Sequence, residues 1–197
     1  YMLVTGLQAY SVYTMDNAID AMSNMKAKVP NIKYDSMNFN QLLIAPFRPK
    51  NIFTPIVGIF TALAGAQLAI SYHNSDVTIA NVDKVGFFDK LISKNVGVPY
   101  YSGVSLGVSY AAGTTEEYLF RNMLLPAFDL GYGQKKGLLY SSLLFGGIHY
   151  LNLLVADKPN FGATTLQVIA ASAGGYLLGR DVQKRDYKIG PAIAAHT

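Results

Sequence analysis

The stretch NIFTPIVGIFTALAGAQLAISYHN, residues 51–74, contains no Asp, Glu, Lys or Arg. A helix that crosses the roughly 30 Å hydrocarbon core of a bilayer needs about 20 consecutive residues whose side chains tolerate leaving water. The glycines and alanines within residues 58–66 are small enough to let neighbouring helices approach closely in lipid. This stretch therefore predicts a membrane-spanning helix.

Three further windows are equally free of charged residues, at 95–115, 137–156 and 159–179, and a fifth apolar run begins at Ile189. Of the 197 residues, 51% are hydrophobic and only 14% are charged, whereas roughly a quarter is charged in a typical soluble domain. If the charged residues were spread at random along the chain, one charge-free window of this length would be unremarkable, but four would not. We therefore predict an all-α fold, a polytopic membrane helical bundle.

The ends of these helices can also be predicted. The second helix keeps a helical composition as far as Pro126, where proline should end it. The fourth window is closed by Gly179 and a basic turn. Glycine and proline mark loops at 131–133 and 158–160.

Residues 1–50 have a different character and predict an amphipathic or interfacial N-terminal segment, or the end of an earlier span. Arg48 and Lys50 are placed to reach lipid headgroups. Residues 51–197 form the predicted membrane-embedded core. Because the chain starts with Tyr1 and stops soon after an apolar run, we expect a fragment of a longer protein, truncated at the C-terminus. Basic residues near the spans number eight on one side and four on the other, so the side with the 180–188 loop should be cytosolic.

Composition also excludes several kinds of site. The chain has no cysteine, which rules out a disulfide framework, Cys-ligated zinc, iron–sulfur clusters and thiol catalysis. The basic loops are short, scattered and without interleaved aromatic residues, so they indicate membrane topology and no nucleic-acid partner.

All the glutamate of the chain lies in one adjacent pair, Glu116 and Glu117. A charge within a spanning segment costs several kcal/mol, so it usually faces a bundle interior or cavity and has a function there. On a helix Glu117 and Arg121 are i, i+4 neighbours that can pair, while Glu116 points about 100° away. In a low-dielectric cavity a carboxylate takes up a proton more readily than in water, which makes Glu116 a candidate general base.

Two histidines are the other polar exceptions in apolar surroundings. His149 lies inside the third window, behind Phe145 and the pair Gly146 and Gly147, which should let another helix come close to it. His196 is carried on the last apolar run, GPAIAAHT.

Taken in order, these residues resemble the motifs of the CAAX protease and bacteriocin-processing (CPBP or Abi) family, which includes the eukaryotic Ras-converting enzyme. The resemblance covers roughly residues 95–197 and lies in three motifs on successive apolar helices: Glu116-Glu117-x-x-x-Arg121, Phe145-x-x-x-His149, and His196. The third motif normally continues with Asn or Asp four residues after the histidine, which is beyond Thr197.

The resemblance implies an integral-membrane endopeptidase, with an active site between the spans, that cleaves a peptide or protein substrate, and we expect it in the bacterial inner membrane. Glu116 would activate a water, assisted by His149 and His196, and Glu117 of the same acidic motif would belong to the catalytic set with them. Arg121, Phe145 and Asn152 would be supporting residues.

Two alternatives follow from the same residues. Glu116, His149 and His196 could hold zinc with an open position, or the glutamate and histidines could act without an obligatory metal, which we favour slightly. The alternative function is a non-catalytic membrane scaffold or transporter-like protein, in which the polar set packs helices or relays protons.

Overall fold

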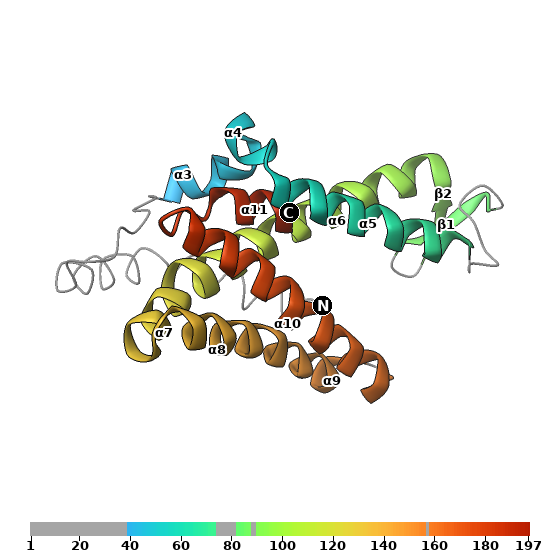
Figure 1. Ribbon diagram of the computed structural model, residues 1–197. Coiled ribbons are helices and arrows are strands. Elements are labelled where there is room, and N and C mark those ends of the chain that lie inside the picture. The colour runs from blue at the N-terminus through green and yellow to red at the C-terminus, as the bar shows by residue number, and fades with distance from the viewer. Residues whose placement is uncertain (1–38, 74–81, 88–89, 157) are drawn as a thin grey trace.

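The computed structural model describes residues 39–73, 82–87, 90–156 and 158–197 (Figure 1). The predictions for residues 1–38 lie outside this part of the chain. Helices dominate the described residues, in the order α3 (Phe39–Ile44), 3₁₀ turn η1 (Ala45–Phe47), α4 (Pro49–Ile52), α5 (Pro55–His73), α6 (Lys94–Glu117), π-helical turn η3 (Tyr118–Leu124), α7 (Leu125–Tyr132), α8 (Gln134–Gly147), 3₁₀ turn η4 (Ile148–Leu151), α9 (Asn152–Val155), α10 (Phe161–Lys184) and α11 (Gly190–His196).

Three of the described helices are long and apolar enough to cross a bilayer: Pro55–His73, Gln134–Leu154 and Phe161–Lys184. They match the first, third and fourth charge-free windows, which confirms the prediction of an all-α membrane bundle. The second window also forms a helix, α6, of 24 residues. It is not among the three because its Ser, Thr, Tyr and Gly residues lower its mean hydropathy, so the span expected there stays a prediction.

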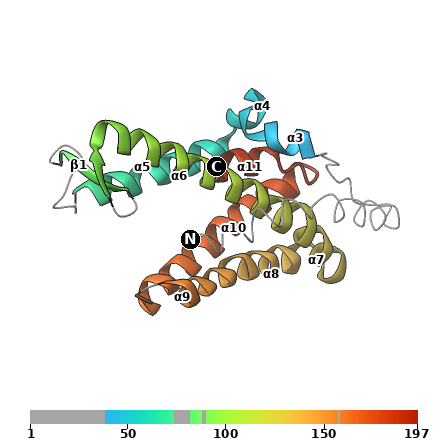
Figure 2. The same cartoon turned by 180° about the vertical axis from the view of Figure 1, so that it is seen from behind.

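The helices form two arms that meet near α11 (Figures 1 and 2). In one arm α8 packs along α10, and in the other α5 and α6 extend away from that pair. An antiparallel hairpin, β1 (Lys84–Phe87) with β2 (Lys90–Ser93), lies at the far end of α6. This hairpin was not predicted from the sequence.

The buried core surrounds α11. Ile193 and Ala192 are fully buried, together with Leu178 and Val182 from α10. Leu42 of α3, from the segment predicted to be interfacial, joins the same cluster. Apolar burial of this kind is the main favourable term that holds a short helix in place, and it fixes the position of the last residues of the described chain.

The helix that carries the glutamate pair does not end at Pro126, contrary to the prediction. The π-helical turn η3 follows α6 without interruption, and the Leu125 amide donates to the carbonyl oxygen of Phe120, five residues earlier. Pro126 follows this turn directly, in the first turn of α7, and the chain stays helical through the proline. The wider turn thus removes the reason for the chain to stop being helical.

Gly179 does not close α10 either, because the helix continues to Lys184. This glycine is a packing position: a Cβ atom there would lie 2.7 Å from Cδ1 of Leu138 on α8. The helix begins where predicted, since Oδ1 of Asn160 accepts a hydrogen bond of 3.0 Å from the Ala163 amide and caps its first turn.

Candidate active site

The glutamate pair lies at the C-terminal end of α6, where the two side chains have different surroundings. The Glu117 side chain is fully buried, whereas that of Glu116 is 25% exposed. Oε1 of Glu117 lies 3.1 Å from Nη1 of Arg121, whose side chain is also buried. This ion pair confirms the i, i+4 pairing that the spacing predicts.

His196 of α11 lies between the two carboxylates. Its Nδ1 is 2.8 Å from Oε1 of Glu117, and its Nε2 is 3.7 Å from Oε2 of Glu116. The first distance is a hydrogen bond, and the second is an ion-pair distance that is too long for one. The approach of α11 depends on Gly113, because a Cβ atom there would lie only 3.1 Å from the carbonyl carbon of His196.

Phe145 of α8 forms the apolar side of the site. Cζ of Arg121 lies 4.1 Å from the centre of its ring, which is a cation–π contact. The ring also makes edge contacts with both imidazoles, at centroid distances of 5.4 Å to His149 and 5.8 Å to His196. Gly175 of α10 allows this stack to form, since a Cβ atom there would lie 2.9 Å from Cδ1 of Phe145.

His149 does not join the two carboxylates directly. It lies in the 3₁₀ turn η4, with Nδ1 3.0 Å from the carbonyl oxygen of Phe145. A carbonyl only accepts, so this bond requires Nδ1 to carry the proton. Glu116, His149 and His196 therefore come together only in part. His196 lies against both glutamates, whereas His149 contacts the Phe145 ring, which also contacts His196.

The metal alternative is not supported by the arrangement of donors. Among the described residues, no group of three His, Asp or Glu side chains is arranged so that it could hold a metal ion. Glu116, His149 and His196 thus do not form the zinc set considered from the sequence.

The two glycines before His149 behave differently. A Cβ atom on Gly146 would lie 1.9 Å from Oγ of Ser172 and 2.6 Å from the carbonyl oxygen of Val168, both on α10, so the predicted close helix approach is confirmed there. A Cβ atom on Gly147 would meet nothing within 4 Å. The predicted close approach therefore does not extend to Gly147.

Asn152 lies outside the carboxylate–histidine cluster. Its Nδ2 donates to Oε1 of Gln167 on α10, at 3.1 Å. This bond fixes the end of the candidate span Gln134–Leu154 to α10 and gives Asn152 a structural contact.

Several buried polar atoms near the glutamate pair have no hydrogen-bond partner among the described residues. They are Oγ1 of Thr114, Oε2 of Glu117, Nη1 and Nη2 of Arg121, and Oδ1 of Asn122. Arg121 and Glu117 meet at ion-pair distance, but the N–H directions do not complete a hydrogen bond. Buried groups of this kind are uncommon in folded proteins and are found at functional sites.

Sequence reasoning missed the polar atoms of Thr114 and Asn122, and it missed Gly113 and Gly175. Gly113 lets α11 pack closely against α6, and Gly175 lets α10 pack closely against Phe145. The one sequence signal for this packing role is that both glycines lie among small residues in apolar windows.

Comparison with known proteins identifies one family. Residues 100–197 match the family described as type II CAAX prenyl endopeptidase Rce1-like. The matched segment runs from α6 to the end of α11 and contains the glutamate pair, Phe145 and both histidines of the site. No curated protein and no solved structure matches the chain. Through residues 100–197 the chain belongs to the Rce1-like family of CAAX endopeptidases, the family that its three motifs resemble.

Proposed function

We propose that this protein is an intramembrane endopeptidase in which Glu116 activates the attacking water and His196 assists it. Family membership supports CAAX endopeptidase activity in general terms. The assignment of residues rests on one observation, the position of His196 between the two glutamates, 2.8 Å from Glu117 and 3.7 Å from Glu116.

The two carboxylates have separate roles in this proposal. Glu117 is buried between Arg121 and His196, so it is a positioning residue that holds the imidazole through Nδ1. Nε2 of His196 then faces Glu116, the more exposed of the pair. A carboxylate that orients an imidazole in this way fixes which ring nitrogen takes part in proton transfer.

The proposed reaction needs only water and a peptide bond. A water oxygen attacks the carbonyl carbon while Glu116 takes one of its protons, and a tetrahedral oxyanion forms. The C–N bond then breaks, and the proton returns to the leaving nitrogen from Glu116 or through Nε2 of His196. With Nδ1 donating to Phe145, the neutral ring of His149 has an acceptor at Nε2, and we assign it to orienting the water.

The test is a cleavage assay with the protein in lipid nanodiscs. The substrates are a peptide with a C-terminal CAAX sequence, farnesylated on its cysteine, and the same peptide without the prenyl group. Glu116→Gln should lower the cleavage rate by about 10²–10⁴-fold, the usual contribution of a general base. Its thermal unfolding should match that of the unchanged protein, because a partly exposed pair contributes about 1 kcal/mol or less.

Asp83→Asn is the matched control, since it makes the same carboxylate-to-amide change at an exposed residue beside the hairpin. It should cleave at the unchanged rate. If Glu116→Gln cleaves as fast as this control, or if the unchanged protein cleaves neither peptide, the catalytic assignment is wrong. The polar set would then serve helix packing or proton relay, as in the scaffold alternative.

The membrane in which the protein lies is a further part of the proposal. Three apolar helices and the membrane-protease family support an integral membrane protein. Placement in the bacterial inner membrane is our proposal, and fractionation of the native host, with the protein expected in the inner-membrane fraction, tests it.

A further inference from the structure

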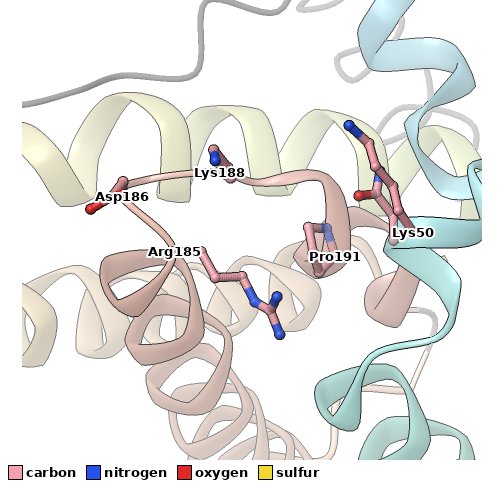
Figure 3. A pocket seen from close by; sticks show the side chains of 6 residues that line it. Lys50, Arg185, Asp186, Lys188 and Pro191 are labelled. Carbon is pink, nitrogen blue, oxygen red and sulfur yellow. The ribbon is translucent and has the colours of Figure 1, made fainter.

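A basic hollow lies away from the glutamate pair, where α4 and the segment between α10 and α11 meet (Figure 3). It consists of two adjoining cavities of about 310 and 220 Å³. The larger is lined by Lys50, Asn51, Arg185, Asp186, Lys188 and Pro191, and the smaller shares four of these residues and adds Gln41, Arg48 and Gly190. The larger cavity lies at the lower end of the range of small-ligand sites, about 300–1,000 Å³.

The charge around this hollow is strongly one-sided, with four cations and one carboxylate, that of Asp186. Figure 3 shows the Arg185 side chain extending toward Pro191, with Lys50 on the far side of that proline, whereas the Asp186 carboxylate points away. Arg185 also pairs through Nε with Asp181 at 2.7 Å. Within the described residues, no ion pair is found for Arg48, Lys50 or Lys188.

The hollow lies at the end of two candidate membrane spans. Lys50 precedes the start of α5 at Pro55 by five residues, and Arg185 directly follows the end of α10 at Lys184. Phe47 and Phe53 nearby are 69% and 85% exposed, as expected of aromatic side chains that enter the interfacial layer of a bilayer. A cation cluster at this level faces lipid headgroups.

We propose that this hollow binds the phosphate group of an anionic phospholipid headgroup. Lys50 and Lys188 supply charge, and the planar guanidinium of Arg185 suits phosphate oxygens. The headgroup is favoured over free phosphate because the hollow opens where two apolar helices leave the hydrocarbon. The proposal is independent of the peptidase chemistry.

The experiment compares two double variants of the whole chain, purified in detergent. Lys50→Gln/Lys188→Gln removes two cations of the hollow, both on exposed side chains. Lys135→Gln/Lys136→Gln removes two exposed cations from the first turn of α8. That turn lies at the same end of the bundle, because Nε2 of Gln183 on α10 donates to the carbonyl oxygen of Gln134 at 3.0 Å.

Binding is measured by native mass spectrometry and by the thermal shift on adding phosphatidylglycerol, phosphatidylcholine or inorganic phosphate. Phosphatidylglycerol should bind to the unchanged protein and to the α8 variant and raise their unfolding temperature, and phosphatidylcholine should do so much less. The hollow variant should bind phosphatidylglycerol at least about tenfold more weakly. The affinity of the single variant Lys188→Gln for phosphatidylglycerol should lie between that of the unchanged protein and that of the Lys50→Gln/Lys188→Gln variant.

Three results would overturn the proposal. Equal loss of phosphatidylglycerol binding in the α8 variant would mean general attraction to a basic surface. Undiminished binding in the hollow variant would place the lipid elsewhere. An equal thermal shift with inorganic phosphate, abolished in the hollow variant, would assign the hollow to free phosphate and not to a lipid.

Discussion

Replacing Glu117 with glutamine should unfold this protein much more readily than the same change at Glu116. Glu117→Gln leaves the Arg121 charge, which is 1% exposed, without its counter-ion. Breaking one side of a buried ion pair costs about 3–5 kcal/mol, because the remaining charge stays out of water. For a chain of this size, that corresponds to a fall of roughly 6–20 °C in unfolding temperature. The amide can still accept from Nδ1 of His196, so the loss is mainly that of charge.

The assay is thermal unfolding in one detergent, followed by intrinsic tyrosine fluorescence and by the fraction that remains monodisperse. The double variant Glu117→Gln/Arg121→Met removes both charges and keeps apolar contact with Phe145, so it should recover most of the lost stability. An unfolding temperature within about 2 °C of the unchanged protein for the single variant would refute the reasoning. So would a double variant that is no more stable than Glu117→Gln, since Arg121 would then not be the stranded charge.

Two further predictions concern packing and pH. Gly146→Ala should destabilise the protein by about 1–3 kcal/mol because α10 must move away, whereas Gly147→Ala should gain up to about 1 kcal/mol of helix propensity; equal unfolding temperatures in the two variants would contradict this. Burial raises the pKa of Asp129, although hydrogen bonds from Tyr187 and Gln183 act to lower it. The stabilising contribution of its protonated form is therefore present below the ordinary carboxyl pKa, about 3.9, and is lost as pH rises through the higher value in the folded protein. As pH rises from the ordinary carboxyl pKa through the raised pKa of Asp129, the unfolding temperature of the unchanged protein should fall relative to that of Asp129→Asn. A difference between the two proteins that stays constant over this pH range would show that Asp129 does not titrate in this way.

The parts of the site that depend on local spacing could be predicted from the sequence. The pair Glu117–Arg121 needs only helical periodicity, and the apolar windows need only the cost of charge in lipid. By contrast, His196 is 79 residues from Glu117, so no local spacing predicts their hydrogen bond. The family resemblance implied only that His196 assists Glu116. No local pattern indicates that His149 and His196 both pack against the ring of Phe145.

Other features escaped because they depend on contacts between distant segments. Pro126 looked like a helix end, since the penalty of proline assumes ordinary α-helical winding before it. Gly179 looked like a terminator, but its missing side chain accommodates Leu138. Lys50 and Lys188 of the hollow lie before and after the three candidate spans in the sequence, so their charges could be counted from the sequence but not brought together.

The π-helical turn between α6 and α7 has a consequence for how related chains compare with this one. A π turn holds one residue more than the α-helical turn that it replaces, while the helices on either side keep their positions. A homologue that winds this segment as a plain α-helix therefore needs one residue fewer between Glu117 and Leu125. Its alignment with this chain should show a single-residue gap within 118–124, with the acidic pair and everything from Pro126 onward still in step.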